Sequence, residues 1–268
     1  MAPTLTLATW NVNSVRAHLG AVERFCRDLR PDLLCLQETK VENGSFPLKP
    51  FSDLGYRHHA LHGRKGYHGV AIFSRELPLE APTSRDWCGI DHARHLYCRI
   101  ADGVELHNFY VPAGGDLPDV ERNDKFRHKL DFMTEVADWF RRRKRRGNRF
   151  ILVGDLNVAP LETDVWNHKQ LLKVVSHTPI EVEHMARWYE SHDWVDAVRL
   201  HVPPEERLYS WWSYRARDWE AADKGRRLDH IWVTPALRSA VRAAAVHKPA
   251  RGWDGASDHA PVLAELIL

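Results

Sequence analysis

Residues 150–157 read FILVGDLN, and they carry the clearest indication of the fold class of this chain. Four consecutive apolar residues are typical of a strand that is covered on both faces. Gly154 ends the run, and Asp155 and Asn157 follow directly. Glycine and Asx residues are ordinary turn formers, but a rigid strand end can also hold polar groups against a ligand. The segment therefore predicts a buried strand that ends either in a plain turn or in a functional site.

Similar apolar runs predict further strands along the chain. They cover residues 4–10, 32–37, 69–73, 95–100, 104–110, 149–154, 229–233 and 261–267. Apolar residues at spacings of three and four predict helices over 14–30 and 119–145. A third helix is predicted to begin with the capping pattern of Thr178, Pro179 and Glu181. The Asp102-Gly103 pair predicts a hairpin turn between two of the strands. This mixture of elements predicts a layered α/β fold with mixed or antiparallel sheets.

The bulk composition is that of a globular protein. The chain has 268 residues, of which 44% are hydrophobic and 28% charged. No apolar run reaches the ~20 residues that a membrane-spanning helix needs. The N-terminal segment MAPTLTLATWN lacks a basic leader and a long apolar stretch, so we expect no secretory signal and a cytoplasmic location.

Cysteine usage and net charge set weaker limits. The four cysteines show no CxxC spacing, which favours free thiols in a reducing compartment. The formal net charge is only +2, so a polyanionic partner is neither required nor excluded. Any attraction for such a partner would have to come from a local patch.

Polar residues stand at the ends or beginnings of six predicted strands. In antiparallel neighbours, the end of one strand and the start of the next share an edge, so these side chains are predicted to converge on one rim. The set is Asn11, Glu38, Tyr110, Asp155, Asn157, Asp229, Asp258 and His259.

The side-chain types in this set favour one kind of chemistry. Hard oxygen ligands suit Mg²⁺, with Mn²⁺ as an alternative. Carboxylates beyond the one or two that bind the ion could orient or deprotonate a water molecule. An imidazole backed by a carboxylate could stabilise a charged phosphoryl oxygen. Together these groups predict metal-assisted phosphodiester hydrolysis, and the absence of a glycine-rich nucleotide loop argues against kinase or NTPase chemistry.

The motifs resemble the exonuclease III family of apurinic/apyrimidinic (AP) endonucleases, within the endonuclease/exonuclease/phosphatase superfamily that includes DNase I. GDLN and SDH are shared with distant phosphatases, whereas LQETK and YSWWSYR are more specific to the DNA-repair branch. The matching stretches, in chain order, are TWNVNSVRA, LCLQETK, KGYHGVAIFSR, NFYVPAGG, ILVGDLNVAP, YSWWSYR, GRRLDHIWV and SDHAPV.

The resemblance implies a single domain over residues 1–268, folded as a four-layer α/β sandwich of two packed mixed β-sheets flanked by helices. It implies that Glu38 is the principal metal ligand, with Asn13 and Asp258 close to the metal. It also implies catalytic roles at six positions: Asp155 for the attacking water, Asn157 and Asn11 in support of it, Tyr110 at the scissile phosphate, and His259 with Asp229 at the phosphate oxygens.

By the same resemblance, Arg16, Gly66 and Tyr67 would grip the DNA backbone, and Trp211 and Leu228 would line a pocket for an abasic sugar. The implied enzyme is an exodeoxyribonuclease III or AP endonuclease. It would be a Mg²⁺-dependent DNA-repair phosphodiesterase that incises 5′ to abasic sites, with 3′→5′ exonuclease and 3′-end cleaning activity. Its expected partner is double-stranded DNA with abasic sites or blocked 3′ ends, not a membrane, and we expect a monomer.

Two positions depart from the family pattern. Ala113 follows Tyr-Val-Pro, where relatives often carry an amide side chain. Arg226 stands where some relatives have an aromatic pocket residue. Neither change removes a group of the proposed chemistry, but both bear on the balance among the activities.

Several assignments stay open at this level. Asp229 could instead form a salt bridge with Arg226 or Arg227. Of Trp211 and Trp212, we expect one in the core and one facing the site. The basic run at 141–146 is read as the end of a helix, about 25 Å from the site at ~3.3 Å per strand residue, and not as a DNA contact.

The histidines of one predicted loop could bind zinc, but exposed loop positions near the DNA-binding edge are favoured for them. They are His58, His59, His62 and His68. Two other functions remain as alternatives: a phosphatase or sphingomyelinase-like hydrolase of the same fold, and a non-catalytic nucleic-acid-binding relative.

Overall fold

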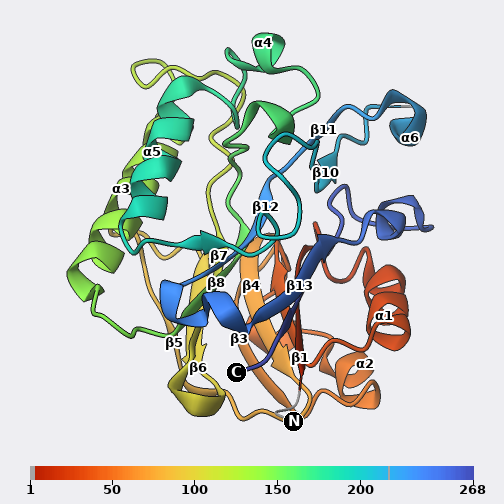
Figure 1. The fold of residues 1–268 in the computed structure, drawn as a ribbon. Coiled ribbons are helices and arrows are strands. Elements are labelled where there is room, and N and C mark those ends of the chain that lie inside the picture. The colour runs from red at the N-terminus through yellow and green to blue at the C-terminus, as the bar shows by residue number, and fades with distance from the viewer. Residues whose placement is uncertain (1–3, 217) are drawn as a thin grey trace.

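Two six-stranded β-sheets form the centre of the molecule in this computed structural model, which describes residues 4–216 and 218–268 (Figure 1). The first sheet has the order β13 (Val241–Val246), β14 (Val262–Leu266), β1 (Leu5–Asn11), β2 (Leu33–Gln37), β4 (Tyr67–Ser74), β3 (His58–Arg64). The second has the order β5 (Glu80–Ser84), β6 (His95–Arg99), β7 (Glu105–Tyr110), β8 (Phe150–Asp155), β12 (Asp229–Val233), β9 (Val195–Asp196). A separate two-stranded ribbon joins β10 (Trp211–Trp212) to β11 (Gly225–Arg226).

Both large sheets are mixed, as predicted. β1 and β2 run parallel, and so do β7 and β8, while the other neighbours are antiparallel. All six residues of β8 are buried, which confirms the prediction of a strand covered on both faces. The predicted strands are all present, with ends that differ by no more than two residues from those read in the sequence.

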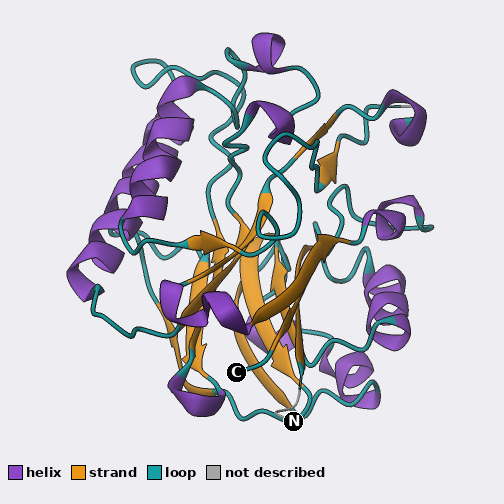
Figure 2. Cartoon of the chain, viewed as in Figure 1, coloured by secondary structure: helices purple, strands orange, loops and turns teal. Residues whose placement is uncertain are grey.

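Helices cover the outer face of each sheet (Figures 1 and 2). α3 and α5 lie together on one side, and α1 and α2 lie on the other. The prediction of a four-layer α/β sandwich is therefore confirmed. The α-helices are α1 (Leu19–Asp28), α2 (Leu48–Asp53), α3 (Asp124–Arg143), α4 (His168–Leu171), α5 (Pro179–Glu190) and α6 (Trp219–Ala222).

Three apolar clusters hold the layers together. Ile72 of the first sheet and Ile151 of the second belong to the core between the sheets. Phe25 of α1 packs with the outer face of the first sheet, and Met133 of α3 packs with that of the second. Each of these side chains is fully buried, and full burial of such a side chain contributes about 1.5–3 kcal/mol. The stable layers provide a rigid support for the strand ends.

The predicted helix over 14–30 begins too early. α1 starts only at Leu19, because Asn13 and Ser14 have positive φ angles of 44° and 97° that a helix does not allow. The backbone N–H of Ser14 donates instead to the carbonyl of Glu38, at 2.8 Å. The spacing of apolar residues gives no indication of this turn. The turn connects the segment after β1 to the segment after β2 by backbone hydrogen bonds.

The predicted helix over 119–145 is shortened for a local reason. The carboxylate of Asp119 accepts the N–H groups of Glu121 and Arg122, which forms a turn and not a helix. Asn123 then caps α3 through its side chain, which accepts from the N–H of Lys125. The helix begins at the next residue, Asp124.

The smaller local predictions are confirmed. Asp102 and Gly103 both have positive φ, at 57° and 69°, as a tight two-residue hairpin turn requires. Thr178 caps α5, and the side chain of Glu181 returns a bond to the N–H of Thr178. All four cysteines are free thiols. No helix within 4–216 and 218–268 combines the length and the apolarity that a bilayer crossing requires.

The assignment of the histidine-rich segment to a loop is wrong. His58, His59 and His62 lie on β3, an edge strand, and His68 lies on β4. β3 was not predicted because its histidines are partly buried or exposed, so the segment lacks the apolar run that indicated the other strands. β5, β9 and β13 were missed in the same way, since they are short or mostly exposed edge elements.

Candidate active site

The polar strand ends converge on one rim of the two sheets, at the end of the molecule opposite both chain termini (Figure 1). Asn11, at the end of β1, links the two sheets: its Nδ2 donates to Glu38 Oε1 at 2.9 Å and to Asp155 Oδ2 at 2.8 Å. Tyr110 is paired with Asp155 in the β7–β8 ladder, and Asp229 is paired with Asp155 in the β12–β8 ladder. Four strands thus deliver their polar residues to one place.

Local backbone conformation turns these side chains toward one another. Asn13, Glu38 and Asn157 adopt positive φ angles of 44°, 51° and 54°. Non-glycine residues seldom adopt this conformation, and those that do often cluster at functional sites. Each of these three residues follows a strand end closely, so the turn that stops the strand also orients the side chain.

Three amide donors surround the Asp155 carboxylate. Asn157 donates to it twice, from its backbone N–H to Oδ1 at 2.9 Å and from Nδ2 to Oδ2 at 3.0 Å, and Asn11 supplies the third donor. Burial raises the pKa of Asp155, and the nearby carboxylate of Asp229 raises it further, while His259 and Asn11 oppose the shift. A carboxylate of raised basicity, held in a fixed orientation, suits a group that takes a proton.

A buried dyad lies beside Asp155. His259 Nδ1 is 2.8 Å from Asp229 Oδ2, and His259 Nε2 is 3.8 Å from Asp155 Oδ2. The hydroxyl of Ser210 donates to the same oxygen of Asp229 at 2.6 Å. Burial lowers the pKa of His259, but the carboxylates of Asp229 and Asp155 outweigh it and raise that pKa to about 10. The imidazole is therefore a cation at neutral pH, with Nε2–H directed toward the site.

The salt-bridge alternative for Asp229 is not what the structure shows. Arg227 instead forms ion pairs with Asp196, at 2.5 Å, and with Asp164, at 3.8 Å. Arg226 donates to Val175 and Ser176.

Removing the carboxylate of Asp229 should restore an ordinary titration of His259. In Asp229→Asn the largest charge that raises the pKa is lost, so we expect the pKa of His259 to fall toward its unperturbed value of about 6.5. Because the folded pKa of the wild type lies above that value, the dyad stabilises the fold below about pH 6.5 and loses this contribution as the pH rises through about 10. NMR titration of the histidine ring protons checks the shift, and stability in EDTA should depend less on pH in the variant.

Asp53→Asn, which removes an exposed carboxylate, serves as the control. An unchanged titration of His259 in Asp229→Asn would contradict the assignment.

A second cluster of oxygen ligands surrounds Glu38. Asn13 Nδ2 is 3.3 Å from Asp258 Oδ1, and Lys40 Nζ is 2.9 Å from Glu38 Oε2. The side chain of Glu38 is 18% exposed and lines the same cavity as Asp258. Burial raises the pKa of Glu38, but hydrogen bonds from Asn11 and Lys40 lower it below its ordinary value. This carboxylate is therefore ionised and accessible, as a metal ligand must be.

The ligand atoms of Asp155, Asp229 and His259 also lie within 4.8 Å of one another, which is a distance that could suit an ion. All three side chains are buried, and Asp229 Oδ2 already accepts from Ser210 and pairs with His259. Mg²⁺ keeps several of its water ligands, and the Asp229 oxygen of this cluster is already engaged by two protein partners. Glu38 is the better candidate for a metal ligand.

Tyr110 is held by two neighbours that the sequence did not reveal. The guanidinium carbon of Arg94 lies 4.6 Å from the centre of the Tyr110 ring, and Arg94 Nη1 donates to the Tyr110 carbonyl. His68 Nε2 accepts from Arg94 Nη2 at 2.9 Å. Burial, and then the charge of Arg94, lower the pKa of His68 to about 4, so its ring is neutral and acts as an acceptor.

A cavity of about 870 Å³ opens beside these groups. Its lining combines the site carboxylates and His259 with tryptophan, leucine and arginine side chains from the segments after β8 and around β10 and β11. The lining includes Glu38, Tyr110, Asp155, Asn157, His259, Trp211, Trp212, Leu228, Arg226, Arg215, Lys224 and Ala113.

The two tryptophans differ in exposure, although both border the cavity. Trp212 is 2% exposed and packs in the core with Tyr209, whereas Trp211 is partly exposed. Trp211 Nε1 donates to Asp258 Oδ2 at 2.9 Å, so the indole is fixed beside the candidate metal ligands. Leu228 forms part of the apolar wall with Trp211.

Three predicted DNA-binding residues lie outside this cavity lining. Gly66 and Tyr67 form the tip of the β3–β4 hairpin, where Gly66 N donates to the carbonyl of Lys40 and Tyr67 is 70% exposed. Arg16 donates to the carbonyl of Ser45 at 2.7 Å. These residues surround the Glu38 side of the site at the surface. Their position is compatible with contact to a long ligand, and the predicted role remains a prediction.

Sequence reasoning missed four supporting residues: Lys40, Arg94, Ser210 and Lys129. Lys40 was visible in the LQETK motif, but the other three carry no local signal. Lys129 projects from α3, is fully buried against Glu181, and donates to the Asn157 carbonyl at 2.8 Å. A lysine in a helix ordinarily indicates solvent exposure, so only the packing of α3 reveals that it supports the turn after β8.

Comparison with known proteins agrees with this geometry. A model described as "Endonuclease/Exonuclease/phosphatase family" matches residues 8–259. An exodeoxyribonuclease of Bacillus subtilis (strain 168) is 30% identical to this chain, over 98% of the chain and 99% of that protein. A solved AP endonuclease from Archaeoglobus fulgidus has a TM-score of 0.91 and 31% identity, over 98% of this chain and 100% of that one. A Neisseria 3′ phosphatase bound to a product DNA hairpin has a TM-score of 0.86 and 28% identity, over 98% and 99% of the two chains.

Proposed function

Because the chain belongs to the endonuclease/exonuclease/phosphatase family and is a hydrolytic nuclease of the exonuclease III type, we propose that it is a Mg²⁺-dependent DNA-repair enzyme. It incises DNA 5′ to abasic sites, and the same site removes 3′ nucleotides and 3′-blocking groups. One observation carries this proposal: Asn11 bonds both Glu38 and Asp155, so a metal-binding carboxylate and a water-activating carboxylate share one rigid link. We extend the proposal to a single domain over 1–268 that acts as a monomer in the cytoplasm.

The ligand chemistry around Glu38 fits Mg²⁺. Glu38 and Asp258 offer carboxylates and Asn13 offers an amide, all of them hard donors, and the cavity leaves room for the water and substrate ligands that Mg²⁺ retains. When bound there, the ion supplies Lewis-acid stabilisation of the phosphoryl oxygens. Lys40, which now neutralises Glu38, provides positive charge on the same side.

Asp155 acts on the attacking water. Its two oxygens are fixed by Asn11 and Asn157, and its raised pKa makes it a competent acceptor for a water proton. The water oxygen forms a bond to phosphorus as the bond from phosphorus to the leaving 3′ oxygen breaks. Fixed orientation of the water lowers the entropic part of the barrier.

His259 stabilises the phosphoryl oxygens. Asp229 keeps the ring oriented and charged, so Nε2–H can donate to the negative charge that builds up in the transition state. Tyr110, whose ring lies against the guanidinium of Arg94, lines the same cavity, and its hydroxyl contacts the same phosphate. The burial that raises the pKa of Tyr110 keeps its hydroxyl protonated as a donor.

The cavity accepts a nucleotide that has left the base stack. An abasic nucleotide costs less to extrude because it has already lost its stacking energy. Trp211 and Leu228 supply an apolar wall for its sugar next to the reacting groups.

A single gel tests the function. It would carry labelled duplexes that contain a tetrahydrofuran abasic site, no lesion or a 3′-phosphate, each with Mg²⁺ and with EDTA. We expect Mg²⁺-dependent cleavage of the damaged substrates, and slower shortening of the undamaged one. An inositol phosphate and a lipid phosphodiester are included, because turnover of those compounds alone would favour the hydrolase alternative. No cleavage under any condition would favour the non-catalytic one.

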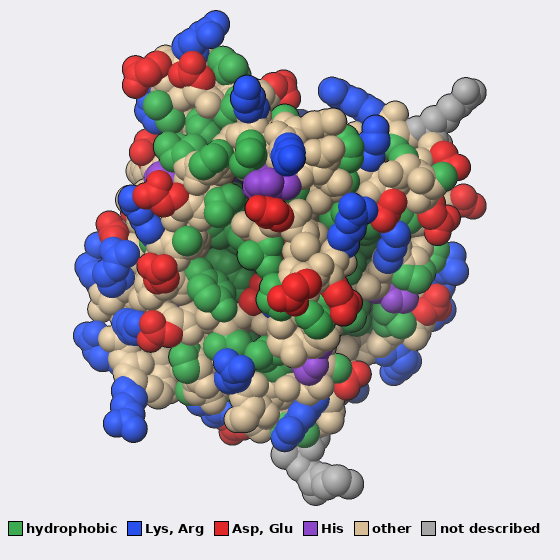
Figure 3. Space-filling model, turned by 45° about the horizontal axis from the view of Figure 1, so that its top comes forward, with side chains coloured by type: hydrophobic (Ala, Val, Ile, Leu, Met, Phe, Trp, Pro, Cys, Tyr) green, Lys and Arg blue, Asp and Glu red, His purple; other side chains and the backbone are tan. Residues whose placement is uncertain are grey.

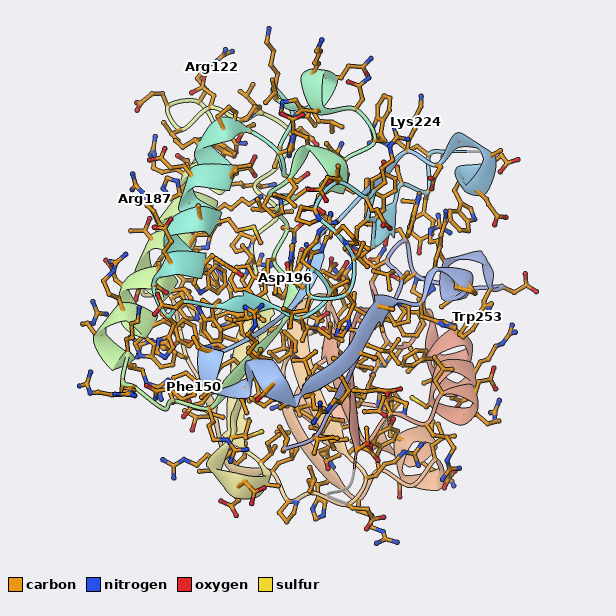
Figure 4. The ribbon with its side chains drawn as sticks, viewed as in Figure 1. Arg122, Phe150, Arg187, Asp196, Lys224 and Trp253 are labelled. Carbon is orange, nitrogen blue, oxygen red and sulfur yellow. The ribbon has the colours of Figure 1, made fainter. Side chains whose placement is uncertain are left out.

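The basic run at 141–146 is expected to have little effect on cleavage. Arg141 pairs with Asp138 and Lys144 with Asp193, at 2.6 Å for the second pair, near the start of β8. Figure 4 places Phe150, at that start, far from Lys224 on the cavity rim. Basic and acidic side chains are also intermixed over the face drawn in Figure 3, in keeping with the small net charge.

Replacing Arg141, Arg142 and Lys144 together with alanine should therefore change kcat/KM on a short abasic duplex by less than about twofold at moderate salt. The matched comparison replaces Arg64 and Lys65, at the β3–β4 hairpin, where we expect a clear rise in KM. A collapse of turnover in the triple variant would show that the basic run does contact DNA.

A further inference from the structure

Arg226 places a positive charge in the wall of the candidate substrate cavity. It is paired with Trp211 in the β10–β11 ribbon, and Trp211 in turn forms a bridge with His259. The guanidinium carbon lies 5.3 Å from the centre of a Trp211 ring. The backbone of Arg226 therefore lies beside that of Trp211, and the backbone of Trp211 lies beside that of His259, whose imidazole faces the site.

The guanidinium is held in place by the neighbouring loop. Arg226 Nη1 donates to the carbonyl of Val175 and to the hydroxyl of Ser176, both at 2.9 Å. The backbone N–H of Ser176 is fixed in turn by the buried carboxylate of Glu181. Within the described residues, Arg226 Nη2 has no hydrogen-bond acceptor. Arg226 lines the cavity, so its guanidinium is a preorganised hydrogen-bond donor in the cavity wall.

Among the described residues, one further arginine and one lysine line this cavity, and both differ from Arg226. Arg215 and Lys224 are exposed on the rim, and Lys224 lies 4.8 Å from a Trp166 ring centre. Arg226 is partly buried in the wall, beside Leu228 and Trp211. A charge in such surroundings is screened less by solvent than a charge on the rim. Arg226 should therefore discriminate among bound groups more strongly than the two rim residues.

We propose that Arg226 is a specificity-determining residue that selects 3′-terminal phosphodiesters whose non-nucleoside portion carries a carboxylate, such as a 3′-phosphoglycolate, over the neutral sugar of an abasic site. The inference rests on the proposed function and deepens it. A carboxylate in the cavity would accept a charge-assisted hydrogen bond from Nη2. A neutral sugar gains no such interaction, and it must displace water from the guanidinium without full compensation.

The reaction itself is the hydrolysis already proposed. The water oxygen bonds to phosphorus, and the bond between phosphorus and the 3′ oxygen breaks. Asp155 takes a proton from the water, and the leaving 3′ oxygen takes up a proton from solvent and ends as a hydroxyl. Phosphoglycolate leaves with its carboxylate unchanged. A plain 3′-phosphate undergoes the same bond changes but has no group that reaches into the cavity. The rate on a 3′-phosphate therefore measures the hydrolysis step without a contribution from a contact with Arg226.

The test compares three duplexes of one sequence, with a 3′-phosphoglycolate, a 3′-phosphate or an internal tetrahydrofuran site. Arg226→Met keeps the aliphatic stem and removes the charge. We expect kcat/KM for phosphoglycolate to fall about tenfold or more, since a hydrogen bond to a charged group is worth at least about one factor of ten. The rate on 3′-phosphate should stay within about threefold, and cleavage at tetrahydrofuran should be unchanged or faster.

Two further variants separate a selective effect from a general one. Lys224→Met removes a rim charge from the same cavity and should leave the ratio of phosphoglycolate to 3′-phosphate cleavage unchanged. Arg226→Lys keeps a charge and should retain a larger part of that ratio than Arg226→Met. The 3′-phosphate rate also monitors damage to the loop at 174–176, because a misplaced loop would slow every substrate.

Equal losses on all three substrates in Arg226→Met, or no loss on phosphoglycolate, would overturn the inference while leaving the proposed function in place. If the wild type cuts none of the three duplexes with Mg²⁺, the proposed function fails, and the specificity role of Arg226 fails with it.

Discussion

Replacing Asp155 with asparagine will lower kcat on a tetrahydrofuran duplex by about a thousandfold or more, which corresponds to a loss of about 4 kcal/mol of transition-state stabilisation. The substitution removes the only base that the structure places beside both Asn157 and His259 at the reacting position, within the described residues. It also disturbs the orientation of the site. All three amide hydrogen bonds at Asp155 point toward its oxygens, so a terminal amide would set one NH₂ group against another donor.

Binding and stability measurements separate this chemical effect from unfolding. Asp155→Asn should bind the same DNA, in Ca²⁺ or EDTA, within about threefold of the wild type. Its Tm should change little, because the lower desolvation cost of an uncharged side chain offsets the unfavourable contact between the new NH₂ group and a donor. The matched control is Asp196→Asn, which breaks a buried ion pair with Arg227, and neither residue lines the cavity. Figure 4 shows Asp196 well apart from Lys224 on the cavity rim. That control should lower Tm while the folded protein keeps its kcat. Near-full activity of Asp155→Asn would end the assignment of this residue.

Replacing Glu38 with alanine will lower activity by about two to four orders of magnitude at low Mg²⁺ concentration, because an ion that stabilises transition-state charge loses its accessible carboxylate ligand. Calorimetric titration should show weaker Mg²⁺ binding, and a high concentration of Mg²⁺ or Mn²⁺ should restore part of the rate. EDTA should abolish the activity of the wild type. Asp155→Asn provides a useful contrast, since its loss should be independent of metal concentration.

Substitution of Lys40 tests the same metal site through a change of Mg²⁺ affinity in the opposite direction. In the protein without metal, its ammonium group neutralises Glu38 and also contacts Asn13. Lys40→Met should therefore leave Glu38 without its cation and increase the affinity for Mg²⁺, whereas Glu38→Ala should decrease it. A Mg²⁺ affinity that is the same in the wild type and in Glu38→Ala would place the ion elsewhere, and the cluster of Asp155, Asp229 and His259 would then be the next candidate.

Much of the fold follows from short-range patterns in the chain. The apolar run before Gly154 predicts a strand with both faces buried, and β8 has that character along its whole length. Thr178 and Glu181 predict the first turn of α5 because both partners of the capping bonds lie within one helical turn. The wrong predictions come from places where distant contacts override local spacing. The segment after Asn11 has helical periodicity, yet its N–H groups bond to the segment after β2.

The same distinction between local patterns and distant contacts applies to the candidate site. Residue types alone indicated oxygen ligands, a carboxylate-backed imidazole and phosphodiester chemistry, because these are properties of the side chains and of their order in the motifs. The contacts among them depend on the way the sheets pack. Asn11 meets Asp155 across 144 positions of the chain, and His259 meets Asp229 because β12 and the segment before β14 come together at one rim.

Short-range information in this chain thus specifies its strands, its caps and the kind of chemistry it can perform, since each of these depends on neighbouring residues or on side-chain type. The raised pKa of His259, the buried lysine beneath Asn157 and the position of Arg226 in the cavity wall depend on burial and on charges brought close by folding. Electrostatic energies vary with distance and with exclusion of water, and neither quantity exists until the layers have packed.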